Sequence, residues 1–338
     1  MIITRTPFRV SFVGGGSDLE SFYRKSPGAV LSTTINKFMY ISSHYFFDED
    51  KVRAKYSQIE TVKNINDLKH PIIREILKKF KVVGALEISS NGDVPAGTGL
   101  GSSSSFTVGL LHNMYTVFGK SVTKKKLAEE ACEIEINKLK EPIGKQDQYA
   151  AAFGGLNVIM FDSSGVVTVE PIHLKKKTYK TLQKNLVMFY TGDKRKTSKI
   201  LSEMKINIEQ KKFESTKKMV ELVWEMRDAL HNGNMEDFGK ILHKNWLLKR
   251  QLASSITNKK INLLYDNGIR NGASGGKLLG AGGGGFLLFY CDEDKQDKLR
   301  RAMNLRELKF KLENEGSKLI YVGSESFERG VKVDGNSN

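Results

Sequence analysis

The sequence predicts an α+β protein made of two domains. Its 338 residues exceed what one ordinary small domain needs and suffice for two. Up to about residue 175, segments rich in β-branched and aromatic residues lie between segments with helical periodicity. Helical periodicity then dominates from residue 197 to residue 271. We therefore predict domains at residues 1–175 and 176–338, divided where the pattern changes.

Residue patterns place the elements of the first half. Strands are predicted at 2–4, 9–13, 29–45, 87–90, 156–161 and 166–172, the last two joined as a hairpin at residues 163–165. A helix is predicted over 102–118, because its apolar residues recur at helical spacing up to Gly119. Thr123 is expected to cap the helix that follows.

The second half is predicted to be helical with three strands. Strands are expected at residues 186–190, 286–290 and 319–322. The long helical stretch is interrupted at 232–234, where Asn-Gly-Asn breaks the pattern, and one more helix is expected over 293–303.

Charge and cysteine content narrow the class of protein. Lys and Arg number 54 against 38 Asp and Glu, and the resulting net charge of +16 favours anionic ligands such as nucleic acid, phosphorylated metabolites or a membrane surface. The two cysteines are far apart, with no CxxC motif or nearby His partner, which argues against a zinc site or disulfide framework and fits a reducing cytoplasm. No apolar run approaches the roughly 18–20 residues of a membrane span.

The segment Pro95–Ser105 indicates a phosphate site. Its glycines at 97, 99 and 101 permit positive φ and a close approach of backbone to ligand, and four serines then begin a helix. Free N–H groups at a helix N-terminus suit phosphate oxygens. The segment is not a Walker A loop, since no Gly-Lys-Ser/Thr ends it, and a dinucleotide-binding loop is poorly matched because the distal acidic residue is missing.

Two carboxylates follow this segment. Glu135 and Asp147 are separated by twelve residues, and Pro142 and Gly144 break the helix between them. They can therefore reach one cleft from separate elements, as phosphoryl transfer requires of a carboxylate for Mg²⁺ and one near the attacking hydroxyl. Two carboxylates at this spacing are common, so the pair indicates a phosphoryl-transfer site only in combination with the glycine-rich segment that precedes it.

Two further glycine-rich segments complete the set. Four consecutive glycines at 282–285 precede a predicted strand and imply a tight bend or a close approach to a ligand. Near the N-terminus a strand runs into the turn Gly14-Gly15-Gly16-Ser17-Asp18. Asp18 is either a ligand-binding carboxylate or a simple helix N-cap.

Together these four segments resemble the GHMP kinase superfamily, in the family's order and over nearly the whole chain. The resemblance implies an S5-like N-terminal domain and a ferredoxin-like α/β C-terminal domain. It also implies ATP as co-substrate and Mg²⁺ as cofactor, with Ser103 and Glu135 as metal ligands. The residues expected to bind ATP are Pro95, Gly97, Gly99, Leu100, Gly101, Ser102, Ser103 and Ser104.

The same resemblance implies roles around the acceptor. Asp147 would lie next to the phosphoryl acceptor, with Lys145 or Arg9 countering the developing charge. Arg195, within the basic run 194–196, is our candidate for binding a phosphate on the substrate. The alternative is that this run is a solvated cluster of surface charge. The residues expected to bind substrate are Asp18, Gly15, Gly16, Ser17, Arg195, Gly282 and Gly283.

Departures from the galactokinase pattern narrow the branch. The Gly-Gly-Gly-Ser-Asp turn, Gly-Lys-Gln-Asp-Gln-Tyr at 144–149 and Tyr-Thr-Gly at 190–192 are similar to the heptose 7-phosphate kinase and fucokinase branch. That similarity implies phosphorylation of the anomeric hydroxyl of heptose 7-phosphate, in GDP-heptose synthesis for surface polysaccharide. The +16 charge suits an acceptor that already carries a phosphate.

Two alternatives are also compatible with these sequence features. A kinase of the same fold acting on fucose or mevalonate is one. The other is a basic nucleic-acid-binding protein, which is disfavoured because Phe106, Phe118, Trp224 and Trp246 fall within amphipathic helices rather than among basic residues. The expected partners are ATP and a sugar phosphate, without nucleic acid or membrane, and a homodimer is left open.

Overall fold

A nine-stranded sheet organises the first half of the chain. The computed structural model describes residues 1–192, 197–323 and 331–334. Within this part the main path of the sheet runs β13-β1-β2-β6-β3-β4, while β7 and β12 pair with β2, and β8 pairs with β7. The strands are β1 (Ile2–Val13), β2 (Gly28–Tyr45), β3 (Val52–Lys55), β4 (Ile59–Val62), β6 (Leu86–Gly92), β7 (Asn157–Phe161), β8 (Val167–Pro171), β12 (Leu312–Glu313) and β13 (Lys318–Val322).

Strand β1 is one continuous strand, where the sequence predicted two. Arg5, Thr6 and Pro7 interrupt the apolar pattern, yet the backbone pairs with β2 through all three. The register with β2 shifts between Pro7 and Phe8, because proline has no N–H to donate to the ladder. Thr6 is fully buried, so a polar residue here marks a packed position.

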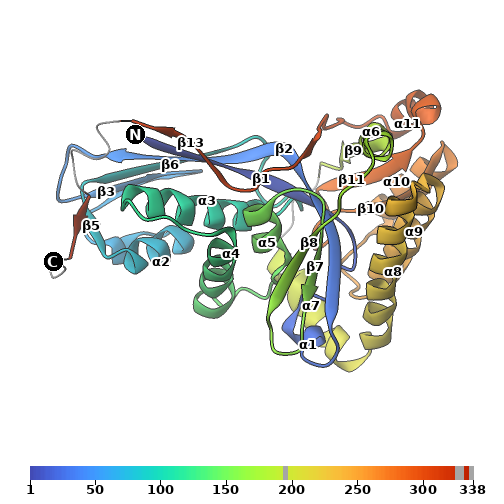
Figure 1. Cartoon of the computed structure of the whole chain (residues 1–338), viewed down its shortest axis with the longest axis horizontal. Helices are drawn as coiled ribbons and strands as arrows, with labels where there is room; N and C mark the ends of the chain where they lie inside the picture. Colours follow the sequence, from blue (N-terminus) through green and yellow to red (C-terminus); the bar gives the residue numbers. More distant parts are fainter. Residues whose placement is uncertain (193–196, 324–330, 335–338) are drawn as a thin grey trace.

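Four helices share one hydrophobic core with this sheet and lie below it in Figure 1. They are α2 (Pro71–Lys79), α3 (Ser102–Val117), α4 (Lys124–Cys132) and α5 (Gln146–Phe153). The predicted cap of α4 is present, since the Thr123 side chain accepts a hydrogen bond from the Lys126 amide. Helix α4 then passes into a π-helical turn, Glu133–Lys138. Such turns often occur at functional sites.

The second half builds a smaller sheet covered by helices. Strands β9 (Leu186–Tyr190), β10 (Ala273–Leu278) and β11 (Phe286–Cys291) pair antiparallel in the order β10-β11-β9. The helices are α6 (Lys176–Asn185), α7 (Thr197–Gln210), α8 (Phe213–Asn232), α9 (Met235–Lys249), α10 (Lys259–Arg270) and α11 (Gln296–Met303). The predicted break is present: Gly233 ends α8 in a left-handed conformation and Asn234 caps α9. Strand β10, hidden in the glycine-rich segment, was not predicted.

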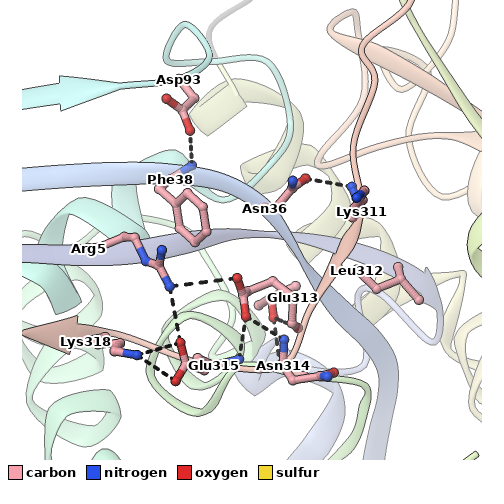
Figure 2. A network of polar contacts seen from close by, with 12 residues as sticks. Arg5, Asn36, Phe38, Asp93, Lys311, Leu312, Glu313, Asn314, Glu315 and Lys318 are labelled. Atoms are coloured by element: carbon pink, nitrogen blue, oxygen red, sulfur yellow. Dashed lines mark hydrogen bonds and ion pairs between the residues drawn. The ribbon is translucent and has the colours of Figure 1, made fainter. Parts of the chain in front are cut away.

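The C-terminal segment returns to the first sheet, where β12 pairs with β2 and β13 with β1. Figure 2 shows the polar contacts that hold it there. The Arg5 guanidinium lies 3.2 Å from the Glu315 carboxylate and 4.0 Å from that of Glu313. The Asn36 side-chain oxygen accepts from the Lys311 amide at 2.6 Å. This segment therefore anchors β1, the strand that carries Arg9.

The short remaining elements of the described residues are α1 (Glu20–Tyr23), β5 (Val82–Gly84), β14 (Lys332–Val333) and two 3-10 helices, Ile65–Asp67 and Glu293–Lys295. The predicted α+β class is confirmed by this architecture, whereas the division of the chain at residue 175 stays a prediction. Across the described ranges, every helix is too short or too polar to cross a bilayer.

Candidate active site

The glycine loop before α3 presents a free helix N-terminus. Gly97, Gly99 and Gly101 all have positive φ. Gly101 occupies the N-cap position in a left-handed conformation, and no side chain caps α3. The amides of the first turn of α3 are thus available to anionic oxygens, and the helix dipole adds to their attraction. The phosphate role of residues 95–104 stays a prediction, for which this geometry leaves the amides accessible.

The C-terminal glycine segment packs against this loop. A Cβ on Gly99 would lie 2.5 Å from the Leu279 carbonyl oxygen, so glycine is needed for the two loops to approach. Gly283 donates its amide to Ile256 O at 2.8 Å, and a Cβ on Gly282 would clash with the same residue. Gly282 and Gly283 therefore face Ile256, and their predicted contact with substrate stays a prediction.

Glu135 lies buried beside the start of α3. Its carboxylate accepts hydrogen bonds from Ser103 Oγ at 2.7 Å, Ser104 Oγ at 2.9 Å and Gln148 Nε2 at 2.8 Å. The π-helical turn after α4 aims this side chain, and α5 contributes Gln148. Burial raises the pKa of Glu135, and these three hydrogen bonds act against that rise. The two predicted metal ligands, Ser103 and Glu135, are therefore in contact.

Asp147 and Arg9 form a bidentate ion pair. Arg9 Nε and Nη2 each donate to an oxygen of the Asp147 carboxylate at 2.7 Å. Arg9 Nη1 also donates to the Gly99 carbonyl at 2.6 Å, which ties the phosphate loop to the pair. A Cβ on Gly101 would lie 3.4 Å from Asp147 Oδ2. The carboxylate is thus held beside the helix N-terminus by a fork-shaped, charge-assisted contact.

A pocket opens next to this pair. Its lining includes Arg9, Asp147, Asp18, Gly15, Gly16 and Lys249. Asp18 accepts from the Gly16 amide at 3.0 Å and from the Gln146 amide at 3.3 Å. Asp18 does not cap α1, whose N-cap residue is Leu19. Burial, followed by the nearby Asp147 carboxylate, raises the pKa of Asp18.

Other predicted site residues lie elsewhere. Lys145 Nζ donates to the Gly165 carbonyl at 2.6 Å in the β7–β8 turn, and its ammonium stands 5.0 Å from the centre of the Tyr23 ring. Ser17 Oγ bonds to the carbonyls of Gly14 and Ala29 and braces the turn. The role predicted for Arg195 falls outside the described residues.

Lys249 was missed by sequence reasoning. It ends a buried stripe on α9 that includes Phe238, Leu242 and Asn245 at helical spacing. A lysine at helical spacing from such buried residues is a sequence signal for a buried polar site, because lysine is almost never fully buried without a partner. Asn245 belongs to the same polar end of the stripe and accepts from the Gly14 amide at 3.2 Å.

Comparisons with known proteins agree with this geometry. Residues 66–155 match the family model of the GHMP kinases N-terminal domain, and residues 226–307 match that of the C-terminal domain. The D-glycero-alpha-D-manno-heptose 7-phosphate kinase of Campylobacter jejuni is 30% identical over 314 residues, which cover 89% of this chain and 93% of that protein. A galactokinase of Pyrococcus furiosus is 27% identical over 345 residues, covering 90% and 93%.

A solved structure shows the same fold. The D-glycero-D-manno-heptose 1-phosphate kinase from Bacteroides thetaiotaomicron superposes with a TM-score of 0.80 at 23% identity, covering 96% of this chain and all of that one. The predicted GHMP kinase fold is therefore confirmed. With both family models matched in order and a relative of 30% identity aligned over most of its length, the chain belongs to the GHMP kinases and is an ATP-dependent kinase.

Proposed function

We propose that this kinase transfers the γ-phosphoryl group of ATP to the anomeric hydroxyl of a heptose 7-phosphate. The observation that carries the proposal is the pocket in which Asp18 lies beside the Arg9–Asp147 pair, directly next to the N-terminus of α3. A polyol held by Asp18 would place one hydroxyl near Asp147. The Campylobacter relative, a heptose 7-phosphate kinase by name, supports the choice of sugar.

The chain's own residues account for binding and proton movement. The amides of the first turn of α3 would hold the ATP phosphates. Asp147 would orient the acceptor hydroxyl or take its proton, with Arg9 fixing the carboxylate in one orientation. An anomeric hydroxyl is more acidic than an ordinary alcohol, so a weak base suffices. Because Arg9 also holds the Gly99 carbonyl, the donor and acceptor sites are fixed relative to one another.

The residues at the start of α3 fit a Mg²⁺ ion. Ser103 and Glu135 supply a hydroxyl and a carboxylate oxygen, the hard ligands that Mg²⁺ prefers. Among the residues described, no three His, Cys, Asp or Glu side chains cluster as a metal cage, which agrees with an ion completed by phosphate oxygens and water. When bound, Mg²⁺ would neutralise charge on the phosphates.

Ser103→Ala is expected to raise the Mg²⁺ concentration for half-maximal activity by about tenfold, because it removes a proposed ligand that also orients Glu135. Titration of activity with Mg²⁺ at fixed ATP measures this. Ser121→Ala, at an exposed serine, is the control. A Mg²⁺ requirement equal to that of the wild type in the Ser103 variant removes Ser103 from the metal site.

A substrate panel tests the proposed acceptor. ADP release with Mg-ATP would be measured for heptose 7-phosphate, mannose 6-phosphate, fucose, galactose and mevalonate. We expect turnover with the heptose phosphate to exceed that with every unphosphorylated acceptor. Turnover confined to an unphosphorylated sugar would leave the kinase assignment intact and reject the heptose phosphate.

An unphosphorylated sugar is the second candidate acceptor. Among the described residues that line the pocket, the two cations Arg9 and Lys249 balance the two carboxylates Asp18 and Asp147, which leaves no formal excess of positive charge in that lining. The galactokinase relative covers as much of the chain as the heptose kinase does. The same panel decides between the two acceptors.

A further inference from the structure

Lys249 is a buried lysine in the wall of the acceptor pocket. It is the last residue of α9 and is 5% exposed. Its ammonium donates a short hydrogen bond to the Gly280 carbonyl. In the part of the chain that the structure describes, no carboxylate lies within ion-pair distance of it. An ammonium carries three donors, so two of them remain available to the pocket.

Lys277 provides an internal comparison. It is also buried, at 1% exposure, but its ammonium donates to the Ser11 and Phe12 carbonyls at 2.7 and 2.8 Å and it does not line the pocket. Lys277 therefore fixes the end of β1. Among the described residues Lys249 has one backbone partner, and it lines the pocket. Burying a poorly partnered charge costs folding free energy. A lysine kept here at that cost therefore indicates a role in binding.

Two more polar atoms in the same wall lack partners among the described residues. Ser11 Oγ and Gln146 Oε1 are inaccessible to solvent and make no hydrogen bond there, and both residues line the pocket. Ser11 is 7% exposed. Buried polar atoms are almost always satisfied, so two unpartnered atoms in residues that line one pocket agree with a wall that forms further hydrogen bonds when a polar ligand binds.

The charge balance indicates which ligand chemistry fits. Arg9 and Asp147 pair with one another, which leaves Lys249 and Asp18 as the charged side chains of the described lining that have no charged partner. A donor and an acceptor that cancel in charge suit neutral hydroxyls, each of which can accept from one and donate to the other. The described residues that line the pocket give a phosphate on the acceptor no net positive charge, so we expect that phosphate to lie outside their reach.

We propose that Lys249 is a specificity-determining residue that donates hydrogen bonds to a hydroxyl oxygen of the sugar acceptor, in concert with Asp18. This inference rests on the proposed function, because it requires a sugar in this pocket. In this proposal Lys249 and Asp18 recognise the non-reacting hydroxyls of the sugar, whereas Asp147 contacts the hydroxyl that is phosphorylated.

Lys249→Met tests this with the wild-type sugar acceptor and its monodeoxy analogues. We expect kcat/KM for the parent sugar to fall about 10- to 100-fold, the range for a hydrogen bond to a charged group, with KM for ATP within twofold. For one deoxy analogue, the wild type should show a reduced kcat/KM, and Lys249→Met should show no further reduction. Removal of the sugar hydroxyl and removal of the lysine ammonium abolish the same contact, so their effects should not add. Lys244→Met, at an exposed lysine on α9, is the control.

The pH profile gives a second measurement. Burial, followed by the Arg9 charge, lowers the pKa of Lys249 to about 8, and Asp18 and Asp147 oppose this; Lys277 is the other cation nearby. A protonated lysine is needed to donate, so wild-type kcat/KM for the sugar should fall as pH rises through about 8. The methionine variant should lack this fall.

Stability separates a binding role from a structural one. The lowered pKa means that the charged ammonium destabilises the fold below about pH 8, so Lys249→Met should melt at or above the wild-type temperature at pH 7. A lower melting temperature with equal losses for ATP and sugar would assign Lys249 a structural role and overturn the inference.

Two remaining outcomes are distinguishable. A wild type that phosphorylates no sugar rejects the proposed function itself. A wild type that is active on a sugar, with Lys249→Met equally active on the parent and on every deoxy analogue, rejects the inference alone. Lys249→Gln keeps a hydrogen-bond donor without the charge, and partial recovery relative to methionine would support donation to a hydroxyl.

Discussion

Asp147→Asn is expected to lower kcat by about 10²–10⁴ while leaving KM for ATP nearly unchanged. The amide cannot take a proton, and it offers Arg9 one acceptor oxygen in place of the two that now bind Nε and Nη2. Both the acceptor hydroxyl and the guanidinium therefore lose their defined orientation. Steady-state kinetics with the sugar chosen by the panel measure the effect.

The control for this variant is Asp266→Asn, which removes an exposed carboxylate on α10. It should retain wild-type kinetics. Because Arg9 also holds the Gly99 carbonyl, a small rise in KM for ATP is compatible with the assignment. Activity of the Asp147 variant within a few-fold of the wild type would take Asp147 out of the catalytic role.

Local sequence patterns predicted the elements that local chemistry specifies. The β-branched run at 29–45 became β2, and the apolar stripe that follows Ser102 became α3. Thr123 caps α4 because its side chain needs only an amide three residues away. These features depend on neighbours in sequence, and for that reason they were readable without the structure.

Features that depend on distant partners were not predicted. The apolar pattern of β1 breaks at 5–7, and its continuity comes from pairing with β2 on one side and β13 on the other. The close approach of Gly99 to the Leu279 carbonyl, which brings the two glycine-rich loops together, was likewise not predicted. Lys249 joins the site only because α9 packs behind residues 9–18. Sequence spacing carries no information about such contacts.

Glu135→Gln is expected to raise the Mg²⁺ requirement by at least about 10- to 100-fold and to lower kcat at fixed Mg²⁺. Glutamine has one acceptor oxygen, so it cannot accept from Ser103 on one side and from Ser104 and Gln148 on the other. Burial raises the pKa of Glu135, which means that its ionised form costs stability at neutral pH. The neutral amide removes that cost, and the melting temperature should not fall.

Glu133→Gln is the matched control, because Glu133 lies on the same π-helical turn but is exposed and, among the described residues, bonds only to Asn137. A Mg²⁺ titration of the three proteins at saturating ATP separates their roles. Wild-type Mg²⁺ dependence in Glu135→Gln would place the metal elsewhere. Excess Mg²⁺ should restore activity to Glu135→Gln by mass action, since the lost interaction is with the ion. It should not restore Asp147→Asn, whose lost interaction is with the acceptor hydroxyl, so one titration distinguishes the metal-binding carboxylate from the acceptor-binding one.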